Sequence, residues 1–144
     1  MRKAVLFAMQ ELESLETTYK KMGWDHALGS SGTIMTIRDV VQAQGWCDSG
    51  ITASALTQLL EALTAIGDSA LLNFAGLSER RKPVFASGVA ILYGVFEALN
   101  LERMDVSEGA LREGLLYDLI GRVHDEDIRD KTIMAVVQRY SVDM

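Results

Sequence analysis

The sequence predicts a helix-rich α/β fold with about seven helices and only two short strands. Apolar residues recur at helical spacing through most of the chain, and one proline occurs in 144 residues. Two short strand-like runs each lead through a glycine-containing turn into a helix. The length suits a single domain. A two-stranded sheet is marginally stable by itself, so we expect its open edge to be paired or covered.

The first part of the chain is expected to form a long helix, a short strand and a second helix. The first helix spans residues 3–22 and ends at Gly23. Its apolar side chains recur at steps of three and four, which places on one face Val5, Ala8, Leu12, Leu15, Tyr19 and Met22. Residues 24–28 are too few for a helix and are interpreted as a strand. The second helix covers residues 33–44.

The middle of the chain is expected to be helical, with a central helix at its end. Thr52 is a suitable N-cap for a third helix, and Asp68 for a short helix through Leu72. Pro83 fits the first position of a long helix reaching residue 99. A helix that is apolar over so much of its circumference belongs in the core. Its expected inward side chains are Phe85, Val89, Leu92, Phe96 and Leu99, with Val84, Ile91 and Val95 widening the stripe.

The last part of the chain begins with the second strand, expected at residues 103–107. A helix over residues 109–120 follows, and Gly121 is expected to end it. An acidic segment at residues 125–127 starts the last helix.

Composition limits the classes of function. The net charge of −6 argues against nonspecific binding of nucleic acid, which needs a basic surface. It leaves a phosphate ligand open, because a cleft can be locally positive on an acidic protein. No apolar run reaches the roughly 18 residues that a membrane span needs, so we expect no membrane contact. The single cysteine, Cys47, fits a reducing compartment, and we expect the cytoplasm.

The chain carries no pattern typical of a metal site or a catalytic thiol. His26 and His124 lie far apart in sequence and lack metal-ligand spacing. Cys47 has no neighbouring histidine that could activate it. We therefore expect no metal ligand and no catalytic residue in this chain.

The most informative motif lies between the first strand and the second helix. It consists of Gly29, Ser30, Ser31, Gly32 and Thr33. Glycine allows the backbone to approach a phosphate closely, and the N–H groups of a first helical turn carry partial positive charge. An ordinary tight turn with Thr33 as the helix cap explains the same residues without a ligand.

Two further segments are candidates for the same site. Glu108 and Gly109 follow the second strand in a similar turn into a helix. Arg81 lies in the densest basic cluster, residues 80–82, and its forked donors suit a phosphate. A solvated cation at a helix start is the alternative for Arg81, and a rigid structural turn is the alternative at residues 108–114.

Taken together, these segments resemble the exopolyphosphatase / guanosine pentaphosphate phosphatase family. The matching stretches are residues 27–33, residues 77–82 leading to 88–92, and residues 107–114. The Gly-Ala-Leu-Arg-Glu-Gly run at residues 109–114 is the most specific. The resemblance implies the C-terminal half of an actin-like ATPase (ribonuclease H-like) fold. Residues 1–123 would then be its C-terminal lobe and residues 124–144 the start of a following helical region.

The resemblance also implies a chemistry. Such enzymes release terminal phosphate from polyphosphate or the 5′-phosphate of guanosine pentaphosphate. Mg²⁺ is expected for the complete enzyme, with none bound by this chain alone. The family's Asp-x-Gly-Ser-Asn-Ser and Asp-x-Gly-Gly-Gly-Ser-x-Glu phosphate loops do not occur in this sequence, so we expect no turnover by this chain. The residues implied in substrate binding are Gly29, Ser30, Ser31, Gly32, Thr33, Arg81, Glu108 and Gly109.

Three interpretations of the chain remain open. The first is a fragment of such a phosphohydrolase, which is completed by an N-terminal lobe or by a homodimer partner. The fragment is expected to be an excised piece, a truncated gene product or one subunit of a split enzyme. A second interpretation is a noncatalytic module that binds phosphate or nucleotide. A third is a structural fragment whose exposed sheet edge drives self-association.

Overall fold

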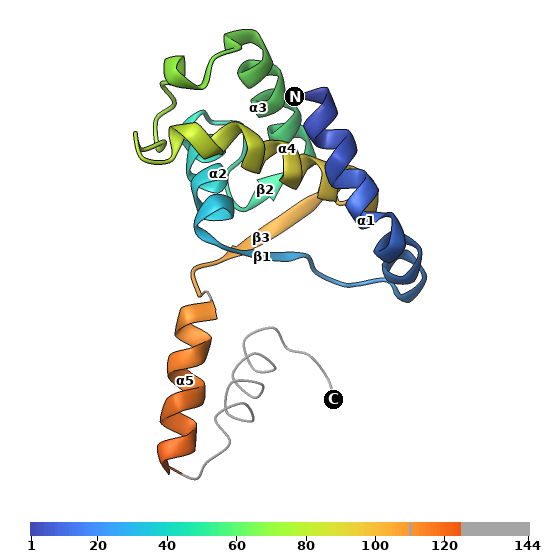
Figure 1. Ribbon diagram of the computed structural model, residues 1–144, viewed down its shortest axis with the longest axis vertical. Helices are drawn as coiled ribbons and strands as arrows, with labels where there is room; N and C mark the ends of the chain where they lie inside the picture. Colours follow the sequence, from blue (N-terminus) through green and yellow to red (C-terminus); the bar gives the residue numbers. More distant parts are fainter. Residues whose placement is uncertain (110, 125–144) are drawn as a thin grey trace. The chain divides into compact units, whose positions relative to one another are not determined.

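The computed structural model describes residues 1–109 and 111–124. The chain divides into two compact units, Met1–Glu108 and Gly109–Met144. The first unit contains the elements α1 (Arg2–Met22), β1 (Leu28–Ser30), α2 (Gly32–Ala43), β2 (Ile51–Thr52), α3 (Ala53–Ile66), the 3₁₀ helix η1 (Ser69–Leu71), α4 (Lys82–Leu99) and β3 (Arg103–Ser107) (Figure 1). The second unit contributes α5 (Leu111–His124). The helix expected from residue 125 lies outside the described residues.

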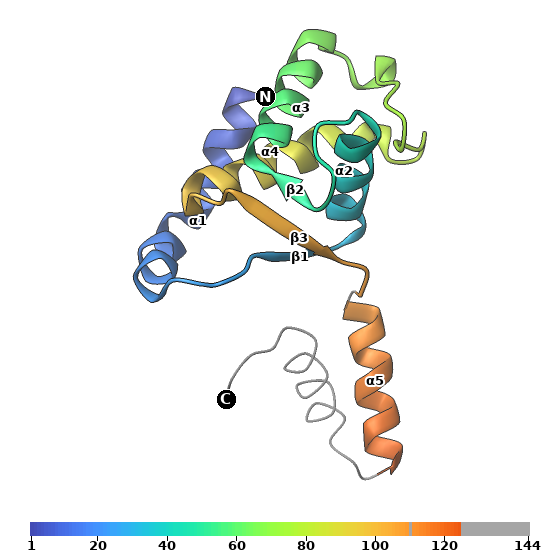
Figure 2. The same ribbon diagram turned by 180° about the vertical axis from the view of Figure 1, so that it is seen from behind.

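The first unit contains a three-stranded sheet in the order β1-β3-β2. β1 lies beside β3 and pairs with it in parallel (Figures 1 and 2). Ser30 lies opposite Ser107 in this register. β2 pairs with β3 in antiparallel orientation, with Ile51 opposite Met104. The expectation of two strands is therefore wrong. β2 has only two residues, too few for an alternating pattern, and it exists because its backbone meets that of β3.

The first strand begins later in the chain than expected. Residues 24–27 precede β1, and His26, expected on a strand, lies in this exposed loop. Gly29 and Ser30, expected in the turn, belong to the strand. Pairing with β3 fixes these bounds, because the short run at residues 24–28 has no alternation that would specify them.

The predicted helices agree with the structure near most of their bounds. Thr52 caps α3, since its Oγ1 accepts a hydrogen bond from the backbone N–H of Ala55 at 3.2 Å. Asp68 caps η1 in the same way through Ala70 at 2.9 Å. Gly121 was expected to end the helix over residues 109–120, but α5 continues to His124. A glycine inside a helix costs only about 1 kcal/mol, which is too little to end it.

The described residues contain five α-helices and one 3₁₀ helix. Of the about seven helices expected, the one from residue 125 lies outside these residues. The chain also divides after Glu108, whereas the sequence analysis placed a boundary after residue 123. That boundary stays a prediction.

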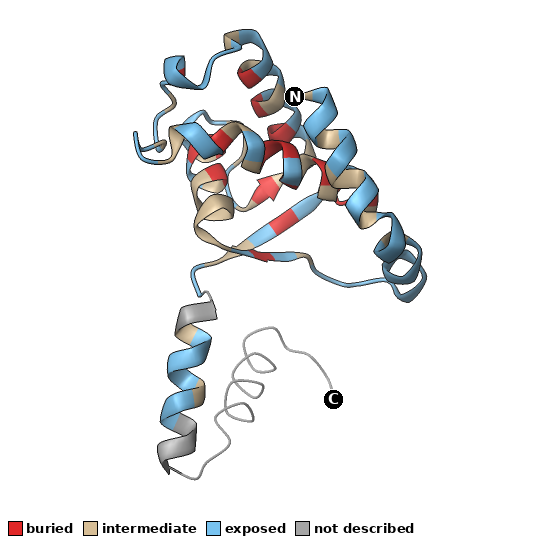
Figure 3. Cartoon of the chain, in the orientation of Figure 1, coloured by how far each residue is buried: buried red, intermediate tan, exposed pale blue. Residues whose placement is uncertain are grey.

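α4 is the central helix of the first unit. It packs against α1, α2, α3 and η1, and part of its length is coloured as buried (Figure 3). Its buried side chains include Phe85, Val89, Leu92 and Phe96. Val84 and Ile91 were expected to widen this stripe, but they are 53% and 56% exposed. Within the first unit, neighbouring helices leave that side of α4 uncovered. By length and composition α4 could span a membrane, and its place in the core accounts for that composition.

α1 lies across α4 at a point of close approach. A Cβ added to Gly94 of α4 would lie 2.8 Å from Cβ of Ala8 and 3.3 Å from the carbonyl oxygen of Val5. Further along α1, Tyr19 and Met22 are 50% and 76% exposed. The expected apolar face of α1 is thus partly covered only in its first half, where α4 meets it.

We predict that Gly94→Ala lowers the free energy of unfolding by about 1–3 kcal/mol, because overpacking outweighs the better helix propensity of alanine. Urea denaturation followed by circular dichroism measures this change. Gly114→Ala in α5 is the matched control, since its Cβ would meet no described atom within 4 Å. Equal stability of Gly94→Ala and the parent chain would contradict the close α1–α4 contact.

Candidate phosphate-binding site

The parallel pairing of β1 and β3 brings two predicted segments to one edge of the sheet. Ser30 and Ser107 are partners in the register, so both strands end at the same place. Ser31 continues from β1, and Glu108 continues from β3. Loops at the carboxyl ends of parallel strands are the usual place for ligands in α/β sheets.

The first turn of α2 presents two N–H donors at this edge. The backbone of Ser31 is extended, and its Oγ accepts a hydrogen bond from the N–H of Ile34 at 3.2 Å. Ser31, and not Thr33, is therefore the N-cap. Among the described residues, the N–H groups of Gly32 and Thr33 bind no acceptor. Such groups at a helix start, together with the helix dipole, favour an anion.

The guanidinium of Arg81 lies against this helix start. A Cβ added to Gly32 would fall on Nη2 of Arg81 and 3.1 Å from its Cζ. Within residues 1–109 and 111–124 the Arg81 side chain has no hydrogen-bond or ion-pair partner. The neighbouring Lys82 instead binds Glu79 at 2.6 Å. The absence of a side chain on Gly32 thus leaves room for a cation beside two free N–H groups.

The loop that carries Arg81 is fixed against the core and α2. The ring of Phe74 lies 6.4 Å from those of Trp46 and Phe85, centroid to centroid. Gly76 has a φ of +88°, and a Cβ there would lie 3.2 Å from the backbone carbonyl of Asp39 in α2. Sequence reasoning missed both positions. An aromatic residue and a glycine between two polar stretches are the only local signal.

In the first motif, packing within the first unit accounts for Gly29 and for the side chain of Thr33. A Cβ on Gly29 would lie 2.5 Å from Sδ of Met104 and 2.9 Å from Cδ1 of Ile34, so packing explains this glycine. Thr33 packs against Gly88 of α4. Ser30 is exposed at the end of β1.

Of the second motif, the first unit contains Glu108, which is exposed beyond the end of β3. Gly109 is the first residue of the second unit. The structure therefore brings together Ser31, Gly32, Thr33 and Arg81 and places Glu108 at the same sheet edge. Their role in binding stays a prediction, as does the role of Gly109.

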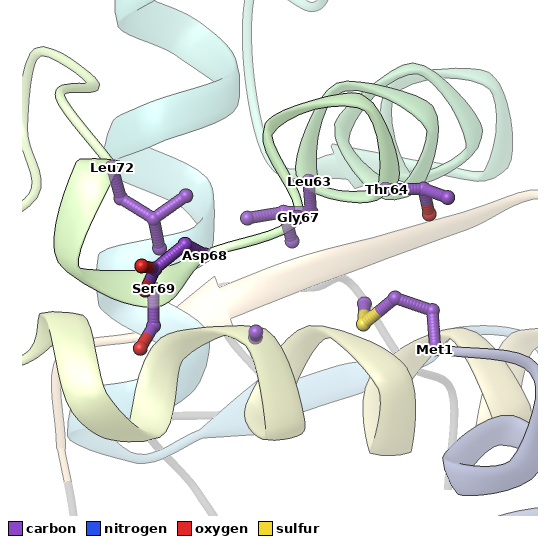
Figure 4. Close-up of a pocket in the computed structure, with 8 residues that line it drawn as sticks. Met1, Leu63, Thr64, Gly67, Asp68, Ser69 and Leu72 are labelled. Atoms are coloured by element: carbon purple, nitrogen blue, oxygen red, sulfur yellow. The ribbon is translucent and has the colours of Figure 1, made fainter.

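Two cavities of the first unit lie elsewhere. One, of about 220 Å³, lies between α3, η1 and Met1, with Leu63 and Leu72 in its lining (Figure 4). The other, of about 320 Å³, lies at the opposite ends of β1 and β3 and is lined in part by Trp24, Glu102 and Arg103.

The described residues do not fit a metal centre. Among them, no group of three or more histidine, cysteine, aspartate or glutamate side chains could hold a metal ion. Cys47 is partly buried, and its thiol donates to the carbonyl oxygen of Gly50 at 3.5 Å. Burial raises the pKa of this thiol, against smaller opposing effects of the Thr52 backbone and Arg103.

A sequence profile of the Ppx/GppA phosphatase family matches residues 1–123. The chain is 38% identical over 142 residues to a guanosine-5′-triphosphate,3′-diphosphate pyrophosphatase of Aeromonas hydrophila, covering 99% of this chain and 28% of that protein. It is 39% identical over 140 residues to the protein of the same name from Vibrio cholerae, covering 97% and 28%. The chain thus spans little more than a quarter of the length of these curated relatives.

Solved structures of the family share this fold. A crystal structure of an Aquifex aeolicus Ppx/GppA family member superimposes with a TM-score of 0.64 and 21% identity, covering 84% of this chain and 40% of that one. A second structure of the Aquifex aeolicus enzyme gives a TM-score of 0.60 at 21% identity, over 78% and 38%.

We predict that Ser31→Ala lowers the free energy of unfolding by about 1 kcal/mol, because the N-cap hydrogen bond is lost. Ser31→Asp keeps a good cap but adds a negative charge beside Gly32, so it should retain stability and weaken binding of inorganic tripolyphosphate. Urea denaturation and titration calorimetry measure the two effects. Tripolyphosphate binding unaffected by Ser31→Asp would place the anion elsewhere.

We predict that Cys47 reacts slowly with iodoacetamide at neutral pH, because a raised pKa leaves less of the reactive thiolate. The rate should rise at higher pH than it does for the chain unfolded in urea. Mass spectrometry of alkylated protein across a pH series measures this shift. Identical pH profiles for the folded and unfolded chain would contradict it.

Proposed function

Because the chain belongs to the Ppx/GppA phosphatase family, we propose that it is part of a phosphohydrolase and forms one wall of its substrate cleft. The proposed fold is the C-terminal half of an actin-like ATPase. The proposed reaction of the whole protein is removal of the 5′-phosphate from guanosine pentaphosphate. The observation that carries the proposal is the Arg81 guanidinium lying against Gly32, beside two free N–H groups of α2.

This arrangement suits a phosphate chemically. Guanidinium donors form paired hydrogen bonds to phosphate oxygens, and the two N–H groups add donors that are fixed by the helix. The acidic side chain two positions before Arg81 is partly neutralised, because Glu79 binds Lys82 at 2.6 Å. Asp39, about two turns further along α2 than Gly32, binds Arg38 at 2.8 Å. A locally positive site can therefore exist on a chain with a net charge of −6.

In this proposal the chain's own residues bind a phosphate of the substrate and orient it. Arg81 and the α2 N–H groups hold a phosphate and offset its charge. Mg²⁺ and the groups that position the attacking water are proposed to come from outside this chain, from an N-terminal lobe or a second copy. The cytoplasm is the proposed compartment.

Guanosine pentaphosphate is preferred over polyphosphate as the substrate for two reasons. The two relatives from Aeromonas hydrophila and Vibrio cholerae carry the name guanosine-5′-triphosphate,3′-diphosphate pyrophosphatase. In addition, the exposed carboxylate of Glu108 at the same sheet edge repels a uniform polyanion, whereas the nucleoside offers it the ribose 2′-hydroxyl and the guanine N–H donors. Polyphosphate remains the alternative substrate.

We predict that Arg81→Glu weakens binding of guanosine tetraphosphate to this chain by at least about tenfold, because a charged hydrogen bond is replaced by repulsion. Arg80→Glu makes the same charge change at an exposed neighbour and should alter affinity less than about threefold. Titration calorimetry at fixed salt measures both.

Four results would count against parts of this proposal. Equal losses from both variants would indicate only a general charge effect. No binding of guanosine tetraphosphate or tripolyphosphate at millimolar concentration would favour the purely structural fragment. Phosphate release with Mg²⁺ by the purified chain, abolished by Arg81→Glu, would contradict the need for another lobe. Binding without any activity in the completed protein would favour the noncatalytic module.

A further inference from the structure

α4 connects the two parts of the candidate site. The helix begins directly after Arg81, and its second turn carries Gly88. Gly88 faces Thr33, which follows Gly32 in the first turn of α2. The same helix therefore holds the cation near its start and supports the N–H donors of α2 two turns later.

The contact between Gly88 and Thr33 is close and specific. A Cβ added to Gly88 would lie 2.5 Å from Cγ2 of Thr33 and 3.9 Å from its Cβ, with no other described atom within 4 Å. A single methyl group of one residue therefore fills the space that a side chain at position 88 would need.

Thr33 has little freedom to give way. It is β-branched and lies in a helix, where its χ1 is restricted to two rotamers. Relief of the clash requires either a turn of χ1, which moves the Thr33 hydroxyl, or a shift of the first turn of α2 away from α4. The second response moves the N–H groups of Gly32 and Thr33, which belong to that turn and lie beside Arg81.

We propose that Gly88 is a positioning residue of the phosphate site. Its missing side chain allows α2 to approach α4, and that approach sets the distance between the N–H groups of Gly32 and Thr33 and the Arg81 guanidinium. Glycine is a poor helix former, so its presence inside an apolar helix is explained by this approach. The inference rests on the proposed function, because it concerns the same phosphate site.

A double-mutant cycle tests this inference in the 144-residue chain. Gly88→Ala should weaken binding of guanosine tetraphosphate about tenfold and shift the NMR amide signals of residues 31–34. Thr33→Ser removes the methyl group that the new Cβ would meet. In that background, Gly88→Ala should change affinity less than threefold and leave the amide signals of residues 31–34 near those of Thr33→Ser alone.

Gly94→Ala is the control for a tightly packed glycine in the same helix. Its Cβ would meet α1, away from the site, so we expect affinity for guanosine tetraphosphate within twofold of the parent chain. If Gly88→Ala alone does not fold, the positioning role is judged from two affinities: that of Thr33→Ser and that of Thr33→Ser combined with Gly88→Ala.

The outcomes separate the two proposals. If the parent chain binds guanosine tetraphosphate and Gly88→Ala binds equally well, the positioning role is overturned and the proposed function stands. An equal loss in the wild-type and Thr33→Ser backgrounds also overturns it, since the Thr33 methyl group would not be the cause. If the parent chain does not bind guanosine tetraphosphate or tripolyphosphate, the proposed function itself fails.

Discussion

The parallel pairing of β1 with β3 is the constraint on which the first unit depends. Parallel neighbours cannot be joined by a tight turn, so the chain must cross over the sheet before it returns. In this protein the crossover contains α2, α3 and α4, which supply most of the core. The register of Ser30 with Ser107 then places Ser31 and Glu108 at one edge. The candidate site lies there because β1 and β3, which are far apart in the sequence, end at the same place.

Glycine residues set the contacts that surround this site. Each of three helical glycines faces a different neighbour: Gly32 faces Arg81, Gly88 faces Thr33, and Gly94 faces Ala8. The first makes room for a cation, and the other two bring helices close to α4. The chemistry at the start of α2 thus depends on packing several turns away. The N–H donors of α2 can act on a phosphate together with Arg81 only when the core holds the two at the right separation.

The acidic character of the chain and its candidate anion site are compatible. Exposed charges separated by more than about 10 Å are largely screened at ordinary salt, whereas charges in contact are not. Glu79, two positions before Arg81, already binds Lys82, and Asp39 of α2 binds Arg38. Local ion pairs, rather than the net charge of the chain, therefore decide which cationic side chain remains available to bind an anion.

Local sequence determined much of this protein. Periodicity and capping residues located the helices, because helix formation depends on neighbours within four residues: Thr52 and Asp68 cap as expected, and β3 has its expected bounds. The motif residues identified the family. The segment at residues 29–33 was singled out as a candidate phosphate-binding motif. In the structure Gly29 is a packing residue and Ser31 is the helix cap.

The tertiary structure decided what depends on distant partners. β2 and the true start of β1 exist only through pairing with β3, and the exposure of Val84 and Ile91 follows from which sides of α4 have neighbours. The approach of Arg81 to Gly32 joins residues about fifty positions apart. No local pattern encodes that distance, because it results from the packing of α4, α2 and the loop between α3 and α4.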